Sequence, residues 1–386
     1  MTAGKSAAAG VYLDYNASVP VRPAAMHAVA LALQGGGNPS SVHAAGRAAR
    51  ALVERARADV AALVGASPAA VTFVSGGAEA NALAIESAVA AGCERIIVGA
   101  TEHDTVRQSA LAAGVPVLEW PVDSDGLAQI DWLADQLAHG PRALVCLMAA
   151  NNETGVIQPL RQTGEMVRAA GGWLHADAIQ AAGKLPIDMA ALGATTLALS
   201  AHKLGGPQGV GALVAAPEAR LTRRLHGGGQ ERGLRAGTEN VPGIAGFGAA
   251  ARETMSEVSH GTRQSQWRDR LAEQVAAGGA VVLGAGAPRL DQTLCFATPG
   301  LPADVQVIGL DLAGVRVSAG AACSSGKVKA SPVIEAMGRP DLAPYSIRIS
   351  GGWASTEDDW LFCGEAWAQI RARHAARDVT RSAELV

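Results

Sequence analysis

The sequence lacks the long apolar runs and the strong charge bias that mark several classes of protein. Its longest apolar run spans residues 143–150, far short of the roughly 18 residues that a membrane-spanning helix needs. Residues 1–10 contain no apolar core of the kind found in a secretory signal. The net charge is only −3 at pH 7, so nothing draws the whole chain to nucleic acid or to an acidic membrane. We therefore expect no membrane association, no secretory signal and no direct binding of nucleic acid.

Cysteine is also scarce. The chain has 5 cysteines, an odd number, and no two of them are closely spaced. This arrangement predicts neither a disulfide framework nor a structural metal site. We therefore expect a protein of the reducing cytoplasm that holds no metal.

The chain is long and apolar enough to build two domains with sizeable cores. It has 386 residues, of which 49% are hydrophobic and 17% charged, as is typical of a globular protein. Up to about residue 260, short β-rich runs alternate with helical stretches, which predicts a parallel sheet covered by helices on both faces. The expected strands are 71–74, 95–98, 115–118, 143–148, 172–175 and 195–199. After about residue 264, short strands mix with helices at 303–312 and 356–371, which predicts a smaller α+β domain followed by a frayed tail.

A lysine and an aspartate follow two of the expected strands. Lys203 comes directly after an apolar run and directly before the glycine-rich turn 205–206, so it lies at the mouth of a sheet. Asp177 follows the strand 172–175. A strand-end amine that can form a Schiff base and a strand-end acid that can pair with a pyridinium nitrogen together suggest pyridoxal phosphate (PLP). Taken alone, Asp177 is more readily explained as a helix N-cap.

A glycine-rich turn, Ser75-Gly76-Gly77, joins the strand 71–74 to a helix. Free backbone N–H groups and the helix dipole at such a turn favour a phosphate group. The alternative is an ordinary strand–helix turn without a ligand.

Three further polar side chains have both a functional and a structural interpretation. His103, after a strand, suits stacking on an aromatic cofactor and proton transfer, or is a surface histidine. Asn152 can hydrogen-bond a cofactor or substrate oxygen, but its neighbours also favour a plain turn. Arg348, inside a short strand, needs an anion, either a substrate carboxylate or an internal salt-bridge partner.

Cys323 differs from the other cysteines because it lies among small residues, within 318–326. An accessible thiol there suits a nucleophile, whereas the other four cysteines lie in or beside apolar elements and are expected to be packing residues. An unperturbed thiol is only slightly ionised at neutral pH. We therefore expect a proton acceptor, His103 or the substrate-bound cofactor, to assist it.

In this order, the motifs closely resemble the cysteine desulfurases of the NifS/IscS type, PLP enzymes of aminotransferase class V with the fold-type-I architecture. The resemblance extends from about Tyr12 to about Trp360. Its most specific parts are 38–43, 151–155, 175–180, 200–209, 227–238 and the Cys323 loop. It implies an α/β fold with a mostly parallel seven-stranded sheet between helices. The large PLP-binding domain would comprise 18–257, and the smaller α+β domain 1–17 with 258–386.

The resemblance also implies which residues carry the chemistry. Lys203 would hold the cofactor and remove the Cα proton, and Asp177 would pair with the pyridine nitrogen. His103 would stack on the ring and transfer protons. Arg348 would hold the cysteine carboxylate. Cys323 would attack the substrate sulfur, leaving an enzyme persulfide and alanine.

The remaining matching positions are implied to bind the cofactor. Gln180 and Asn152 would lie at the phenolic side of the ring. The phosphate would be surrounded by Gly77, Ala78, Ser200, His202 and Thr238, the last from the second subunit of a homodimer.

The chain departs from the family pattern at a few positions. The family usually has threonine where this sequence has Ala78, so one hydroxyl–phosphate hydrogen bond is missing. Such a loss costs about 1–3 kcal/mol if the phosphate oxygen stays unpaired. The opening 13–18 also differs, and Gly352-Trp353 replaces a Gly-Arg pair. These last two changes bear on substrate preference rather than on the chemistry.

The resemblance favours an L-cysteine desulfurase that supplies sulfur, through an acceptor or scaffold protein, to iron–sulfur cluster or thio-cofactor assembly. A selenocysteine lyase would use the same PLP and Lys203. A class V aminotransferase would consume a keto acid and need no Cys323. A non-enzymatic sulfur-relay or scaffold subunit is a further alternative, against which the intact Lys203, Asp177 and Cys323 argue.

Overall fold

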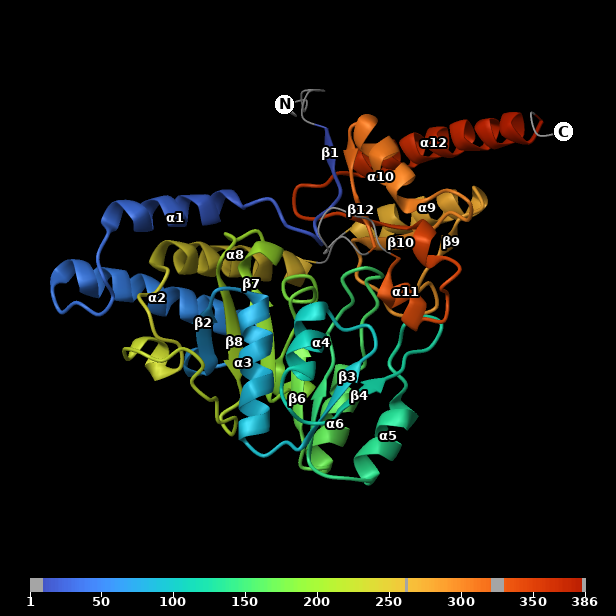
Figure 1. The fold of residues 1–386 in the computed structure, drawn as a ribbon. Coiled ribbons are helices and arrows are strands. Elements are labelled where there is room, and N and C mark those ends of the chain that lie inside the picture. Colours follow the sequence, from blue (N-terminus) through green and yellow to red (C-terminus); the bar gives the residue numbers. More distant parts are fainter. Residues whose placement is uncertain (1–9, 261–262, 321–329, 384–386) are drawn as a thin grey trace.

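The larger sheet has seven strands, in the order β2-β8-β7-β6-β5-β3-β4 (Figure 1). The computed structural model describes residues 10–260, 263–320 and 330–383. Five neighbouring strands are parallel, and only β8 runs antiparallel to both of its neighbours. The strands are β2 (Val71–Val74), β3 (Arg95–Gly99), β4 (Val117–Trp120), β5 (Ala143–Cys146), β6 (Trp173–Asp177), β7 (Thr196–Ser200) and β8 (Gly211–Ala215). The expected mostly parallel seven-stranded sheet is confirmed, although β8 was not among the predicted strands.

Helices cover both faces of this sheet because successive strand residues point into two separate cores. On β3, Ile97 belongs to the core that α2, α6 and α8 complete. Its neighbours Ile96 and Val98 belong to the core that α3 and α4 complete. The helices of this part are α1 (Pro23–Gly35), α2 (Ala44–Leu63), α3 (Gly77–Ala90), α4 (Asp104–Leu111), α5 (Ile130–Ala138), α6 (Leu160–Ala169), α7 (Met189–Leu192) and α8 (Val241–His260).

The parallel strands β3, β5, β6 and β7 all end at the same edge of the sheet. The chain that follows each of them carries predicted functional residues. These segments are 101–103, 148–152, 177–180 and 200–203, the last including the short helix η2 (Ala201–Lys203). The topology therefore brings together residues that are up to about one hundred positions apart in the sequence.

A smaller antiparallel sheet, β12-β13-β10-β9, forms the second part of the molecule. Its own core contains Phe296, Trp360 and Trp367. Its elements are α9 (Gln264–Ala277), β9 (Val281–Val282), β10 (Thr293–Ala297), α10 (Ala303–Leu312), β12 (Ser318–Ala319), α11 (Pro332–Ala336), β13 (Ser346–Ser350) and α12 (Glu357–Ala383). The predicted smaller α+β unit is present, and α10 has the predicted bounds. The prediction of a frayed tail after Arg371 was wrong, because α12 continues to Ala383.

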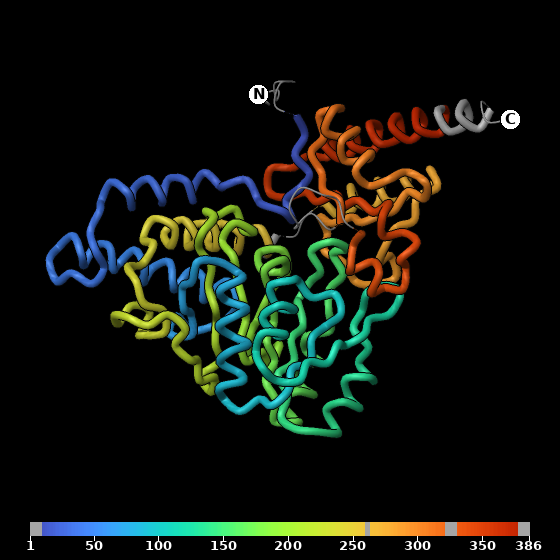
Figure 2. The backbone as a smooth tube through the Cα atoms, in the orientation of Figure 1, coloured from blue at the N-terminus to red at the C-terminus, as the bar shows by residue number. Residues whose placement is uncertain are grey.

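The N-terminal segment connects the two parts (Figure 2). β1 (Val11–Tyr12) pairs with β11 (Val315–Arg316), and Asp14 then bridges to Ser350 of β13. A few residues later, the Val19 amide donates to the His202 carbonyl of the larger part. The predicted domain boundaries, after residues 17 and 257, remain predictions. Within the described ranges, no helix is long and apolar enough to cross a membrane.

Candidate active site

The shared edge of the parallel strands borders a cavity of about 570 Å³. A cavity of this size suits a small organic cofactor together with a substrate. Ten of the predicted site residues line it: Gly77, Ala78, His103, Asn152, Asp177, Gln180, Ser200, His202, Lys203 and Arg348. The structure therefore brings together residues that the sequence could only assign one by one.

Lys203 stands where the N-terminal segment meets the cavity. Its Nζ atom donates hydrogen bonds to the carbonyl oxygens of Asn16, at 2.5 Å, and Ala17, at 2.8 Å. Its neighbour His202 lies 3.3 Å, Nδ1 to Oγ, from Ser18. Burial and the charge of Lys203 lower the pKa of His202 to about 4, so this imidazole is neutral at pH 7.

Asp177 ends β6 with its carboxylate buried and hydrogen-bonded. Its Oδ1 atom accepts from the Ile179 amide at 3.0 Å, and its Oδ2 atom accepts from Asn81 Nδ2 at 2.9 Å. Asn81 in turn lies 3.0 Å, Oδ1 to Nε2, from His175. A carboxylate held in this way at the cavity wall suits the partner of a pyridinium nitrogen.

His103 forms the N-cap of α4. Its Nδ1 atom accepts from the Thr105 amide at 3.1 Å and lies 2.9 Å from the Thr105 hydroxyl oxygen. That same hydroxyl accepts from Asn81 Nδ2 at 2.9 Å. His103 and Asp177 are therefore linked through Thr105 and Asn81.

The start of α3 has the features of a phosphate site. No side chain caps this helix, whose N-cap is Gly76. A Cβ atom on Gly77 would lie 2.2 Å from Cδ1 of Ile179, and one on Gly211 would lie 2.7 Å from Cα of Gly76. Only glycine fits this close packing without rearrangement, and it leaves backbone N–H groups and the helix dipole facing the cavity.

An acid and an arginine stabilise this turn. Glu79 accepts from the Ser75 amide at 2.7 Å and from Arg235 Nε at 3.0 Å. Burial opposes ionisation of Glu79, but these hydrogen bonds outweigh it and lower its pKa. The exposed Ser75 also lines the cavity. Its side chain also hydrogen-bonds Glu79.

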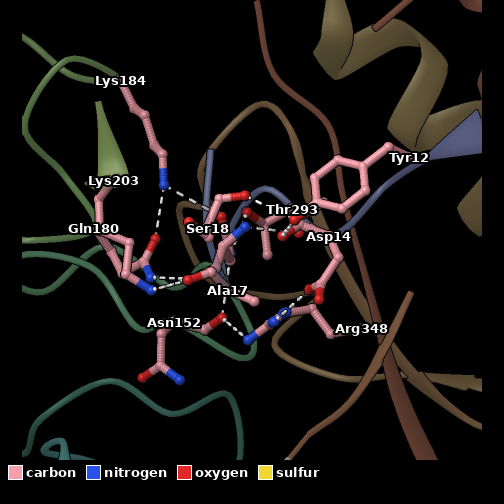
Figure 3. Close-up of polar contacts among 12 residues, drawn as sticks. Tyr12, Asp14, Ala17, Ser18, Asn152, Gln180, Lys184, Lys203, Thr293 and Arg348 are labelled. Atoms are coloured by element: carbon pink, nitrogen blue, oxygen red, sulfur yellow. Dashed lines mark hydrogen bonds and ion pairs between the residues drawn. The ribbon is translucent and has the colours of Figure 1, made fainter. Parts of the chain in front are cut away.

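Arg348 makes the internal salt bridge that was one of its two expected interactions. It lies buried on β13, and its guanidinium forms an ion pair with Asp14, NH2 to Oδ1, at 2.7 Å (Figure 3). It also donates to the Asn152 carbonyl at 3.0 Å. Because Arg348 lines the cavity as well, it combines an internal salt bridge with a position suited to a substrate carboxylate.

Gln180 and Asn16 form a second cluster at the cavity wall with Lys184, and Figure 3 labels Gln180 and Lys184. Gln180 donates to the Asn16 carbonyl at 2.8 Å and accepts from Lys184 Nζ at 2.6 Å. Lys184 also donates to Asn16 Oδ1 at 3.1 Å. Burial, together with the charge of Lys203, lowers the pKa of Lys184 well below its usual value.

The remaining two predicted site residues are Cys323 and Thr238. Cys323 lies outside the described residues. Thr238 is exposed, beyond the short helix η3 (Gln230–Gly233). Nothing tests the expectation that Thr238 contacts a phosphate in a second subunit.

The other four cysteines are packing residues, as predicted. All are free and nearly inaccessible: Cys93, Cys146, Cys295 and Cys363. Burial raises the pKa of each thiol. None of the four is therefore suited to nucleophilic attack.

Sequence reasoning missed several residues that hold this site together. Asn16, Asn81, Thr105 and Asp14 were not singled out for a role, although each contacts a predicted functional residue. The spacing of Asn81 from the glycine turn was a weak signal, since it puts this residue one helical turn into α3.

The residues present fit PLP. The cavity combines an uncapped helix start for the phosphate, Asp177 for the ring nitrogen and Lys203 for the aldehyde. Ser200 and His202 line the same cavity and would lie with Gly77 around the phosphate.

Comparisons with known proteins cover nearly the whole chain. A family model described as aminotransferase class-V matches residues 11–360. A cysteine desulfurase of Frankia sp. (strain EuIK1) is 43% identical over 376 residues, which cover 90% of this chain and 88% of that protein. A NifS-like protein from Rickettsia africae superposes with a TM-score of 0.86 at 31% identity, covering 94% of this chain and 99% of its own. SspA, solved in complex with cysteine, superposes with a TM-score of 0.75 at 28% identity, covering 88% and 98%.

Proposed function

The chain belongs to the aminotransferase class-V family and is a PLP-dependent cysteine desulfurase, and we propose that it transfers the sulfur of L-cysteine to Cys323 and releases L-alanine. The resemblance drawn from the motifs is confirmed by these matches. The observation that carries the proposal is the single cavity shared by Lys203, Asp177, Arg348 and the start of α3. Cysteine as substrate is supported by SspA, which binds it.

Different residues around the cavity would bind different parts of the cofactor and the substrate. Gly77, Ala78, Ser200 and His202 would hold the phosphate, while Gln180 and Asn152 would lie beside the phenolic oxygen. When bound, PLP supplies an electron sink next to the substrate Cα. Lys203 removes the proton from that carbon, and Arg348 orients the substrate through its carboxylate.

The sulfur step requires a second nucleophile. The Cys323 thiolate attacks the substrate sulfur, so that an S–S bond forms while the bond between that sulfur and Cβ breaks. The electron pair of the broken bond stays on carbon, which takes a proton and leaves as alanine. L-cysteine and a thiol thus give alanine and a persulfide, with no oxidant or reductant required.

The persulfide sulfur then passes to an acceptor. We propose a sulfur-acceptor or scaffold protein of iron–sulfur cluster or thio-cofactor assembly. The four described cysteines are free thiols, which supports a reducing, cytoplasmic setting. A selenocysteine lyase or an aminotransferase is less favoured, because the relatives are cysteine desulfurases.

Two variants test this function. Purified protein with PLP and L-cysteine should release alanine and, with added thiol, sulfide. Lys203→Ala should abolish both products, because it removes the amine that would hold the cofactor and take the Cα proton. Cys323→Ser should still bind cysteine, as seen in the absorbance of the holoenzyme, but should release neither product at a useful rate.

Mass spectrometry provides the matched control for Cys323. After cysteine treatment, an added mass of about 32 Da should be found on the Cys323 peptide. Cys363→Ser, which removes a buried thiol, should leave this modification in place. Normal turnover by Cys323→Ser, or the added sulfur on one of the four buried cysteines, would refute the mechanism.

A further inference from the structure

One side-chain amide connects the acid of the candidate site to two histidines. Asn81 is completely buried on α3. Its Nδ2 atom lies 2.9 Å from Asp177 Oδ2 and 2.9 Å from Thr105 Oγ1, and its Oδ1 atom lies 3.0 Å from His175 Nε2. All the hydrogen-bonding positions of this amide therefore have partners, except one lone pair of the oxygen.

The orientation of the amide follows from Asp177. An ionised carboxylate only accepts hydrogen bonds, so the group of Asn81 that faces it must be the NH₂ group. A flipped amide would place its oxygen against the carboxylate oxygen, leaving both without a proton. The Asn81 oxygen therefore faces His175.

This orientation fixes the proton of His175. An amide oxygen can only accept, so Nε2 of His175 must carry the hydrogen. The ring is buried, and burial lowers its pKa to about 4, so it is neutral at pH 7. Its Nδ1 atom is then unprotonated and accepts from the Thr196 hydroxyl, 3.0 Å away.

The same orientation fixes the proton of His103. The second N–H of Asn81 donates to the Thr105 hydroxyl oxygen, which turns the hydroxyl proton toward His103 Nδ1, 2.9 Å away. The Thr105 amide donates to the same nitrogen at 3.1 Å. His103 Nδ1 can accept from either group only while it carries no proton, so the ring proton lies on Nε2.

We propose that Asn81 and Thr105 are positioning residues that hold His103 in the Nε2–H tautomer, so that it enters the reaction as a hydrogen-bond and proton donor. The ionised Asp177 sets this direction through Asn81. This role rests on the proposed function and argues against His103 as the proton acceptor for Cys323. It also gives the two groups separate roles, because Lys203 acts as the base and accepts a proton while His103 acts as the acid and donates one.

The tautomers can be measured directly. In holoprotein labelled with ¹⁵N-histidine, long-range ¹H–¹⁵N correlation spectra distinguish Nε2–H from Nδ1–H rings, and His103→Gln and His175→Gln assign the two signals. Both rings should be Nε2–H tautomers at pH 7. An Nδ1–H tautomer at either position would overturn the proposal.

The variants test the catalytic consequence. Thr105→Val removes the hydroxyl at nearly constant size. It should lower kcat about tenfold, less than the loss of a general acid itself, while KM for cysteine changes less than about twofold. Its His103 signal should show a mixture of tautomers, and Thr105→Ser should restore both readouts. Parent-like kcat and tautomer in Thr105→Val would contradict the proposal.

The outcomes separate this inference from the proposed function. If the parent releases no alanine from cysteine but shows both Nε2–H tautomers, the proposed function is wrong and the positioning role of Asn81 and Thr105 is supported. If the parent is active but His103 is an Nδ1–H tautomer, the positioning role of Asn81 and Thr105 is wrong and the proposed function is supported.

Discussion

At the scale of single residues, the phosphate end of the cavity depends on very small side chains. Ala78 supplies no hydroxyl, and Gly77 has no room for a Cβ atom. The nearby Ser75 is exposed and lines the cavity, but its side chain hydrogen-bonds Glu79. The affinity for PLP therefore depends on backbone N–H groups more than on side-chain donors.

Ala78→Thr should tighten the retention of PLP. A threonine hydroxyl in the first turn of α3 adds one donor for the phosphate, worth about 1 kcal/mol or a severalfold slower loss of cofactor. Dialysis followed by absorbance of the retained cofactor measures this. Ala78→Val, which adds similar bulk without a hydroxyl, is the control. Faster loss from the threonine variant than from the parent would show that the phosphate lies elsewhere.

His175 should make the fold sensitive to acid. Its folded pKa of about 4 lies below the ordinary value of 6.5, so the unfolded chain binds more protons between these two pH values. The contribution of His175 to the free energy of unfolding is therefore fully present above about pH 6.5 and decreases as the pH falls toward 4. Between pH 7 and 5 the histidine alone should cost about 2 kcal/mol.

Chemical denaturation at pH 7 and pH 5 tests this. His175→Gln keeps a side-chain donor for Asn81 but does not titrate. Its loss of stability between the two pH values should be smaller than that of the parent by about 2 kcal/mol. An equal loss in both proteins would mean that His175 does not titrate on unfolding in this range.

At the scale of secondary-structure elements, the site depends on how closely α3 approaches the end of β6. The contact is between Gly77 at the first position of α3 and Ile179 just after β6. Ile179 also lines the cavity. The size of one residue therefore limits the size of the other.

Gly77→Ala should displace Ile179 rather than unfold the protein. The new Cβ atom would lie 2.2 Å from Cδ1 of Ile179, the flexible end of that side chain, which would be pushed into the cavity. We expect severalfold weaker retention of PLP with little change in thermal stability. Gly77→Ala combined with Ile179→Ala should recover most of the retention. A double variant no better than the single one would show that the contact does not control the cavity.

At the scale of the whole molecule, the glycine- and arginine-rich loop 227–238 is anchored to the larger part of the fold. Glu231 and Arg232 adopt positive φ values of 46° and 57°. The Glu231 carboxylate accepts from both terminal nitrogens of the buried Arg57, at 2.8 and 2.9 Å, and from the Phe73 amide at 2.9 Å. These contacts anchor the backbone a few residues before the exposed Thr238.

We propose that two subunits share each active site, and complementation tests this. In a mixed dimer, one chain carries Lys203→Ala and the other Thr238→Asp, whose carboxylate would repel the phosphate. One of the two sites then has an intact lysine and an intact threonine, so the dimer should have about half of the parent activity. Each variant alone should be nearly inactive, and Thr238→Ser is the matched control. Full activity of the parent as a monomer at high dilution would rule out a shared site.

The sequence alone determined the class of fold and most of the chemistry. Continuous apolar strands alternating with helices predict a parallel sheet, since only burial on both faces accounts for strands without polar positions. Lys203 and Cys323 could be singled out from their local sequence, whereas Asp177, more readily explained alone as a helix N-cap, was assigned a role only together with Lys203. The strand β8 and the helices α1, α2 and α8 were not among the elements predicted from the sequence.

Only the tertiary structure decided how the residues of the site act on one another. Asn16 is far from Lys203 in the sequence, and Asp14 is far from Arg348, yet each pair is in direct contact. Hydrogen bonds depend on distance and direction between atoms, and chain folding sets both. For the same reason, the link that Asn81 makes from Asp177 to two histidines could not be predicted before the fold was known. Local sequence motifs identify the types of catalytic group, whereas the tautomers and hydrogen-bond partners of these groups depend on long-range packing.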